Sequence, residues 1–323
     1  MLVLGLQGSP RKKGNTEFLL SLFLEEARKY GAQTHMVNVC QKHIEPCKEF
    51  TTCEKKGFCP IQDDMDPEIY PLLRKADVVV PASPVFFYNV TAQLKALIDR
   101  SQTLWARNYR LKLTDPKRGI RRGFMLSQGA TKGKNLFLGV DLTAKYFFDA
   151  VGARYSGSLY YWQIEHRGDM ERHPSVRGDV AAAVGDLLKP YVGRRKILFA
   201  GGRGSARNQM AGAFAQMLGG EKIDALIGCD RPAEKIDPLM EAVMAEKRID
   251  MGFRIPESID TALEAGPPDM IVAMGCGDIP SAPNAVRVDW DLPDPEGLDI
   301  EAMRSLRDEI EKRVSDLIGQ LKS

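Results

Sequence analysis

The sequence lacks any run of about 18 apolar residues, so we expect no segment that spans a membrane. Cysteine is scarce, with six in 323 residues, which excludes a disulfide-stapled scaffold. Excess charge is missing too: a formal net charge of +2 gives no bulk argument for nucleic-acid binding. The apolar start lacks the basic residues of a signal peptide and meets Pro10 early. We therefore expect a cytoplasmic protein that binds neither membrane nor nucleic acid.

Short apolar stretches alternate with segments of helical period throughout the chain. The expected strands are 2–7, 35–39, 76–83, 122–128 and 154–162, followed by 196–201, 223–228 and 269–274. This alternation is typical of parallel sheets covered by helices on both faces. Apolar residues make up 44%, enough for two cores, and Pro190 and Gly193 interrupt the pattern. We predict two three-layer parallel-sheet α/β domains, 1–192 and 193–323.

The stretch QGSPRKKGNTEF (7–18) joins the first strand to the first helix. Gly8 and Gly14 allow close backbone approach, and polar side chains surround the expected helix N-terminus. Several donors aimed at one point there suit a phosphate. An ordinary polar turn is the alternative. The candidate donors are Ser9, Arg11, Asn15 and Thr16.

Two further loops reach the same edge of the predicted sheet. ASPVFFYNV (82–90) carries three aromatic residues, and SQGATKG (127–133) is polar. Ligands bind beyond the carboxyl ends of strands in open α/β sheets, and a flat cofactor with a phosphate tail would use all three loops. Alternatively, one of Phe86 and Phe87 belongs to the core.

These motifs, with the cysteine-containing run between them, closely resemble the NAD(P)H-dependent FMN reductases and their relatives, the iron–sulfur flavoproteins, over about residues 1–180. The resemblance implies a flavodoxin-like fold, FMN as cofactor, NAD(P)H as cosubstrate and a homodimer or homotetramer. FMN would do the chemistry, so no residue is predicted to be catalytic. The phosphate would lie on Ser9, Arg11, Asn15 and Thr16. The ring would lie near Pro84, Val85, Phe86, Phe87, Asn89, Ser127, Gly129 and Ala130.

The cysteine run departs from this family. Cluster-bearing relatives have four closely spaced cysteines, but Phe50 stands at the second position here. The cysteines that remain are Cys47, Cys53 and Cys59. Because a four-iron cluster takes four thiolates, we expect structural or redox-active thiols and no metal. Asp63 and Asp64 follow, and we expect them to cap the next helix.

A second glycine-rich loop, GGRGSARNQ (201–209), follows the strand at 196–201. No Lys-Ser or Lys-Thr pair follows, so it is not a Walker motif. It also lacks the last glycine of the G-x-G-x-x-G pattern, so it is not a dinucleotide fingerprint. Arg207 can contact an oxyanion with two hydrogen bonds. The loop residues we expect to bind an anion are Gly202, Gly204, Ser205 and Arg207.

This loop, IDPLMEAVMAEKRID (236–250), AMGCG (273–277) and DWDLPDP (289–295) resemble arsenate reductases of the low-molecular-weight tyrosine-phosphatase fold over about 195–320. The resemblance pairs Asp294 with the acidic-loop aspartate and Cys276 with a redox cysteine. Gly201 stands in place of the nucleophilic cysteine. Losing a nucleophile costs on the order of 10⁶ in rate, whereas losing one loop side chain costs binding a few kcal/mol. We expect anion binding without catalysis; a relic that serves packing or oligomerisation is the alternative.

Together, these features predict an FMN-dependent NAD(P)H oxidoreductase that passes electrons to an unknown small-molecule acceptor and carries a fused oxyanion-binding domain. Two alternatives stay open. One is a flavin and oxyanion sensor with little turnover. The other is a flavin-linked arsenate reductase that works through Cys276.

Overall fold

The computed structural model describes residues 1–277 and 285–321, and the chain divides into two compact units. Unit 1 comprises residues 1–111 and 120–192. Unit 2 comprises residues 193–323 together with 112–119, a segment that the sequence assigned to the first domain. No helix among the described residues is long and apolar enough to cross a membrane.

Unit 1 is built on a parallel sheet. Its strands lie in the order β2-β1-β3-β4-β5 and are β1 (Leu2–Gln7), β2 (Gln33–Asn38), β3 (Val78–Pro84), β4 (Arg122–Gln128) and β5 (Arg154–Tyr161). This is the flavodoxin-like strand order. The register places Gln7 opposite Ala82 and Pro84 opposite Gln128, so the loops that follow β1, β3 and β4 leave from one edge.

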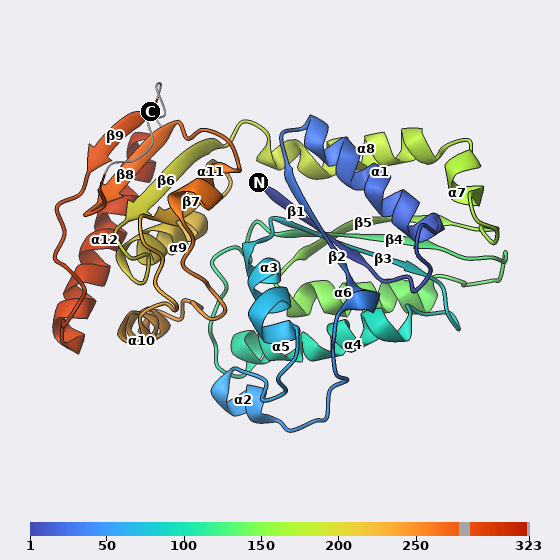
Figure 1. Cartoon of the computed structure of the whole chain (residues 1–323), viewed down its shortest axis with the longest axis horizontal. Coiled ribbons are helices and arrows are strands. Elements are labelled where there is room, and N and C mark those ends of the chain that lie inside the picture. Colours follow the sequence, from blue (N-terminus) through green and yellow to red (C-terminus); the bar gives the residue numbers. More distant parts are fainter. Residues whose placement is uncertain (278–284, 322–323) are drawn as a thin grey trace. The chain divides into compact units, whose positions relative to one another are not determined.

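Helices cover both faces of this sheet (Figure 1). One face carries α1 (Asn15–Lys29), α7 (Asp169–Arg172) and α8 (Val176–Leu188), and the other carries α3 (Tyr70–Lys75), α4 (Ala92–Arg100), α5 (Gln102–Tyr109) and α6 (Leu138–Ala150). Helix α1 buries Leu20, Phe23 and Leu24 against Val180 and Val184 of α8. Apolar residues three or four apart explain why both segments are helical.

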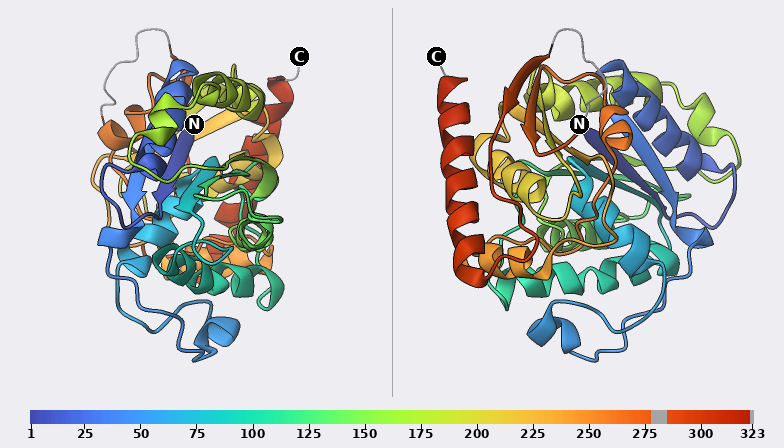
Figure 2. Two further views of the ribbon diagram at one scale, coloured as in Figure 1. Left: turned by 90° about the vertical axis from the view of Figure 1, so that its right-hand side faces the viewer. Right: turned by 60° about the vertical axis from the view of Figure 1, so that its left-hand side comes forward.

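The segment between β2 and α3 carries the cysteine run and projects away from the sheet of unit 1 (Figures 1 and 2). It contains η1 (Val39–Gln41), α2 (Thr52–Lys56) and the π-helix η2 (Met65–Ile69). The Asp63 carboxylate accepts from the N–H groups of Glu45 (2.9 Å) and Met65 (3.0 Å) and pairs with Arg100 (2.5 Å). Asp64 instead accepts from the N–H of His43 (2.8 Å). The two aspartates therefore anchor the projecting segment; only Asp63 also binds the first N–H of the next helix.

Unit 2 is a smaller three-layer unit. Its described strands are parallel in the order β7-β6-β8-β9, with β6 (Arg195–Gly201), β7 (Ile223–Cys229), β8 (Met270–Met274) and β9 (Val286–Asp289). One face carries α9 (Arg207–Gly219), α10 (Pro238–Glu246) and α12 (Ile300–Gln320), and the other carries α11 (Ile259–Leu263). Helix α12 packs along α9 (Figure 2). The predicted fold class, two parallel-sheet α/β domains, is confirmed.

The segment 112–119 joins unit 2 through backbone pairing. The Thr114 N–H donates to the Arg248 carbonyl (2.7 Å), and the Asp250 N–H donates to the Thr114 carbonyl (2.9 Å). Replacing Thr114 with proline deletes the first of these donors. We expect Thr114→Pro to lower stability by about 1–3 kcal/mol and to speed limited proteolysis at 112–119. The matched control is Lys112→Gly, which relieves a φ of +59° and keeps the pairing; equal cleavage of both variants would contradict the prediction.

Candidate functional site

The loop after β1 is fixed by backbone contacts. The Gly8 N–H donates to the Ala82 carbonyl (2.8 Å), and the Thr91 hydroxyl donates to the Gly8 carbonyl (2.5 Å). A Cβ on Gly8 would lie 2.9 Å from the Leu94 Cβ and 3.0 Å from the Ala82 oxygen, so glycine is required there. These contacts join the loops after β1 and β3 into one structure.

Helix α1 starts directly behind this loop. Its N-cap residue is Gly14, and no described side chain caps its first turn. The first N–H groups of a helix have no intrahelical acceptor, and they carry the positive end of the helix dipole. Ser9 is buried, and its hydroxyl accepts from the Arg11 N–H (3.2 Å). This arrangement can bind a phosphate group.

Two buried glutamines lie where β1 and β4 end. The Gln7 side-chain oxygen accepts from the Ser9 N–H (2.5 Å), and the Gln128 amide nitrogen donates to the Thr16 hydroxyl. The Gln7 Nε2 and the Gln128 Oε1 have no partner among the described residues. A buried polar group without a partner costs about 1–3 kcal/mol. A ligand with phosphate and hydroxyl groups would satisfy this unpaired donor and acceptor, which the sequence did not reveal.

Asn15 and Arg11 contact the segment after β5. The Asn15 amide donates to the His166 carbonyl (2.9 Å), and its oxygen accepts from the Gly168 N–H (3.1 Å). Arg11 Nη1 lies 3.5 Å from the Glu165 carbonyl. Segment 165–168 is therefore held beside the start of α1. Asn15 positions that segment, and its direct contact with a phosphate stays a prediction.

The loop after β3 is a tight hairpin. Phe86 and Asn89 exchange two backbone hydrogen bonds (2.8 and 3.0 Å), so Phe87 and Tyr88 form the turn with φ of +46° and +62°. Two-residue turns with positive φ favour Asn-Gly, so two aromatic residues here hold backbone strain, which is typical of functional sites. The exposed fraction is 50% for Phe86 and 102% for Phe87, so the core assignment for one of them is wrong.

Other predicted ring contacts surround this hairpin. The Val85 N–H donates to the Gln128 carbonyl (2.9 Å), and Pro84 ends β3. The Ser127 hydroxyl is buried and donates to the Ser83 carbonyl (2.8 Å). Ala130 is exposed at the same edge. Their contact with a ring system stays a prediction.

Gly129 and Gly133 lie close to side chains of the site. A Cβ on Gly129 would lie 2.6 Å from Leu136 Cδ2, and one on Gly133 would lie 2.8 Å from the Tyr88 hydroxyl oxygen. Tyr88 therefore bridges the loops after β3 and β4. Tyr88 is one of the three aromatic residues of the 82–90 motif, but it was not among the predicted ring contacts.

The three cysteines of the projecting segment differ in exposure. Cys47 is exposed, and Cys53 and Cys59 are half-buried. Burial raises the pKa of Cys53, and the neighbouring Cys59 and Cys47 add to the rise. Among residues 1–277 and 285–321, no group of three cysteine, histidine or acidic side chains is arranged to hold a metal. Phe50, which the resemblance places at the second cysteine position, is exposed.

In unit 2, the loop between β6 and α9 turns its carbonyls outward. Each carbonyl from Gly201 to Ser205 accepts one hydrogen bond. In chain order the donors are the Asp230 N–H (3.1 Å), the Arg231 N–H (3.0 Å), the Ala233 N–H (2.9 Å), Gln209 Nε2 (3.1 Å) and the Asp237 N–H (2.9 Å). In a planar trans peptide the N–H points opposite to the carbonyl, so the loop N–H groups face inward. Gly204 has a φ of +72°, which glycine tolerates. Successive backbone N–H groups of this kind can bind an anion, and we call residues 202–207 the anion nest.

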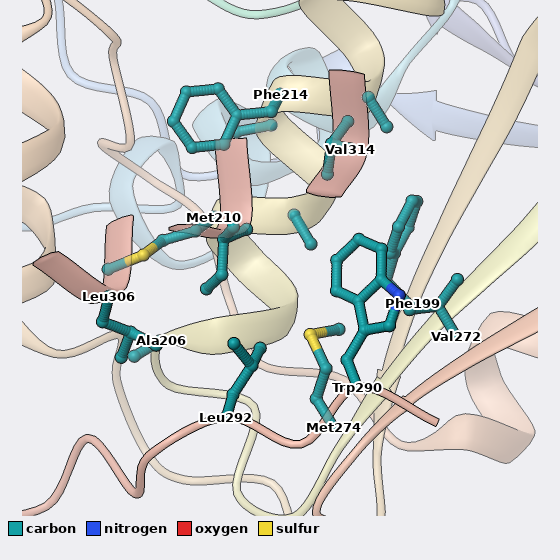
Figure 3. Packing of buried hydrophobic residues seen from close by; sticks show 14 of the residues in the cluster. Phe199, Ala206, Met210, Phe214, Val272, Met274, Trp290, Leu292, Leu306 and Val314 are labelled. Atoms are coloured by element: carbon teal, nitrogen blue, oxygen red, sulfur yellow. The ribbon is translucent and has the colours of Figure 1, made fainter. Parts of the chain in front are cut away.

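The acidic loop lies beside this nest. Trp290 and Leu292 pack into the core near Phe199, Met274 and Ala206 (Figure 3), which fixes the start of the acidic loop. Arg207 Nη1 donates to the carbonyls of Leu292 (3.2 Å) and Pro293 (3.3 Å). The Asp294 carboxylate accepts from the Glu296 N–H (3.0 Å). The loop between β6 and α9, which includes Arg207, lines a cavity of about 620 Å³ together with Asp294.

Both units match known families. The model of low molecular weight phosphotyrosine protein phosphatases matches residues 196–323, and the model of NADPH-dependent FMN reductases matches residues 1–114. The glutaredoxin arsenate reductase of Synechocystis sp. is 32% identical over 131 residues, which is 39% of this chain and 98% of that protein. The chain belongs to the low molecular weight phosphotyrosine protein phosphatase family through unit 2. Unit 1 carries an FMN reductase-family domain.

A relative of unit 1 and a solved structure similar to unit 2 show how much of the chain each comparison covers. An iron–sulfur flavoprotein of Methanosarcina thermophila is 44% identical over 112 residues, 35% of this chain and 58% of that protein. The chain spans about half the length of the iron–sulfur flavoproteins that it matches. A solved structure, "An arsenate reductase in the phosphate binding state", is 28% identical with a TM-score of 0.36, covering 39% of this chain and 98% of that one.

The phosphatase-family loop of this chain has no thiolate at its base. Gly201 occupies the position of the family's nucleophilic cysteine. The neighbouring Cys229 and Cys276 do not replace that nucleophile. Burial, with the charges of Asp230 and Glu257, raises the pKa of Cys229 to about 11, and its thiol donates to the Glu257 carbonyl (3.0 Å). Burial and Asp230 also raise the pKa of Cys276. Both are therefore neutral thiols at pH 7, and thiols are weak nucleophiles.

Proposed function

We propose that the chain is an FMN-dependent NAD(P)H oxidoreductase that passes electrons to a small-molecule acceptor, with an arsenate reductase-like unit that binds an oxyanion without covalent chemistry. The observation that carries the first part is the uncapped α1 N-terminus beside the unpaired Gln7 Nε2 and Gln128 Oε1. The FMN reductase-family domain supplies the chemical context. A cytoplasmic homodimer or homotetramer belongs to the same proposal.

The residues of unit 1 divide the ligand between them. The first-turn N–H groups of α1, with Ser9, Arg11 and Thr16, would hold the phosphate, and the two glutamines would meet the hydroxyl groups next to it. Bound FMN supplies the hydride-accepting chemistry. The protein's own part is to place the ring between the Phe86–Asn89 hairpin and the loop after β4. The strained backbone of the hairpin, at Phe87 and Tyr88, holds the exposed aromatic residues there.

The two alternatives have less support. A flavin-linked arsenate reductase needs a reactive thiolate at Cys276. Burial raises the pKa of Cys276, which keeps the thiol protonated near pH 7. A sensor with little turnover does not require an oxidoreductase-family domain. Steady NAD(P)H oxidation by the purified FMN-loaded chain with a quinone acceptor distinguishes our proposal from the sensor. Activity that survives Cys276→Ser excludes the flavin-linked arsenate reductase. Oxidation that stops after one equivalent of NAD(P)H favours the sensor.

Binding of FMN depends on the backbone at Gly8. We expect Gly8→Ala to weaken FMN binding at least about 100-fold, because the new Cβ must displace Leu94 or the Ala82 carbonyl and so move the phosphate loop. The matched control is Gly178→Ala in α8, where a Cβ meets nothing within 4 Å. Quenching of FMN fluorescence measures both affinities. Equal affinity for the two variants would reject the cradle.

The anion nest has its own test. We expect calorimetry to show that arsenate or phosphate binds the FMN-loaded chain and that Arg207→Ala loses this binding. Circular dichroism of the variant confirms folding. Heat that is absent from the wild type, or unchanged in the folded variant, would leave unit 2 without the proposed role.

A further inference from the structure

The cavity in front of the unit 2 loop is much larger than a single oxyanion. Its volume of about 620 Å³ lies within the range of organic-ligand pockets, roughly 300–1,000 Å³. Residues 201–208 and 275 line one part of it; residues 231, 233–238 and 294–296 line the rest, which we call the outer part. An anion on the loop N–H groups would leave the outer part free for the rest of a larger molecule.

Three charged side chains of this cavity have no charged or hydrogen-bonding side-chain partner among the described residues. Arg203 pairs with Glu296 (3.4 Å), and the Asp237 carboxylate caps α10 by accepting from the Leu239 N–H (2.7 Å). Arg231, Glu234 and Lys235 are exposed and form no ion pair or side-chain hydrogen bond with a described residue. They offer two cationic donors and one carboxylate acceptor, which is a set that binds hydroxyl groups.

No aromatic side chain lines the cavity within the described part of the chain. Its apolar lining residues are small or short: Ala206, Ala233, Ile236, Pro238 and Pro295. Trp290, an aromatic residue near the acidic loop, is packed into the core instead (Figure 3). An aromatic ring gains affinity by burying apolar area, about 25 cal/mol per Å², and these walls offer little to bury it against. A hydroxylated ligand finds partners on the same walls.

We propose that this cavity binds a phosphomonoester with a hydroxylated, non-aromatic body, a sugar phosphate in chemical class, and does not cleave it. The phosphate lies on the N–H groups of 202–207, and the body reaches Arg231, Glu234 and Lys235. The inference rests on the oxyanion binding proposed for unit 2 and narrows it to a ligand class. Without a thiolate at Gly201, the ester bond stays intact.

Calorimetry on the full chain loaded with FMN compares three probes: glucose 6-phosphate, phenyl phosphate and inorganic phosphate. Loading with FMN keeps the probes out of the unit 1 cradle. We expect glucose 6-phosphate to bind at least about tenfold tighter than inorganic phosphate. The dissociation constant of phenyl phosphate should lie within about threefold of that of inorganic phosphate. We also expect no phosphate release from glucose 6-phosphate over hours.

Two variants locate the contacts. Arg231→Ala combined with Lys235→Ala is expected to remove most of the preference for glucose 6-phosphate over inorganic phosphate. Lys222→Ala, which removes one exposed cation at the opposite end of β7, is the control and should keep that preference. Circular dichroism shows that each variant is folded.

The outcomes separate this inference from the oxyanion proposal. Inorganic phosphate that binds as tightly as glucose 6-phosphate, or phenyl phosphate that binds tightest, overturns the ligand class and leaves the oxyanion role standing. Binding of none of the three probes overturns both. A preference that survives the double variant overturns the assigned contacts.

Discussion

Replacing Gly201 with cysteine is expected to create a thiol that reacts with iodoacetamide at pH 6 about a hundred times faster than an ordinary cysteine. The new side chain would stand at the base of a loop whose N–H groups face inward, and such groups stabilise a thiolate. A pKa lowered from about 8.5 to about 6 accounts for the factor, because the thiolate fraction at pH 6 rises from below 1% to about half.

The structure has room for this substitution. A Cβ at Gly201 would lie 3.3 Å from Asn208 Cγ, so the asparagine side chain has to move by only a few tenths of an ångström. Mass spectrometry after alkylation identifies the labelled residue, and added phosphate or arsenate should protect it. Gly201→Ser is the matched control for the steric change. Cys229, whose pKa is raised to about 11, is an internal control that should stay unlabelled. If the thiol of Gly201→Cys reacts no faster than free cysteine, the loop is not an anion nest.

The sequence predicted the parts of this site that depend on local pattern. Glycine-rich loops between an apolar strand and a helix are recognisable because only glycine tolerates close backbone approach. It did not predict α8, although Val176, Val180 and Val184 share one helical face, because Gly178 and Gly185 lower the helix propensity. Strand β9 was missed because it is short and exposed.

Contacts between residues far apart in the chain could not be predicted from one sequence. The unpaired Gln7 and Gln128 become visible only when β1 and β4 are placed in one sheet. The same holds for Asn15 with His166 and for Thr114 with Arg248. Local periodicity carries no information about such pairs, since each depends on how strands are ordered and how loops pack.

The ion pair between Asp63 and Arg100 explains how the projecting cysteine segment is held. Both side chains are almost fully buried, with exposed fractions of 0% and 1%. Burial alone would raise the pKa of Asp63, but hydrogen bonds from Arg100 and from the N–H groups of Glu45 and Met65 outweigh it and hold the pKa below its usual value. Arg100 also donates to the Glu45 carbonyl (2.8 Å), so one guanidinium ties both ends of the segment to α4.

We expect Arg100→Met to destabilise the protein by about 3–5 kcal/mol at pH 7, because it leaves the buried Asp63 carboxylate without its counterion. Urea unfolding followed by circular dichroism measures the loss. The double variant Arg100→Met with Asp63→Leu should recover only part of it. The apolar pair removes the uncompensated charge, but the N–H groups of Glu45 and Met65 lose their acceptor. A single variant as stable as the wild type would mean that water reaches the carboxylate.

The pH dependence provides an independent test of the same pair. In the wild type the lowered pKa of Asp63 adds stability above the unfolded pKa, near 3.9, and that stability is lost as the pH falls through the folded value. In Arg100→Met, burial is expected to raise the pKa above the unfolded value, so the variant binds an extra proton when folded. Its stability should then increase as the pH falls from 7 towards 5, a range in which the Asp63 contribution in the wild type is constant. Parallel profiles for the two proteins would show that Arg100 does not set the charge state of Asp63.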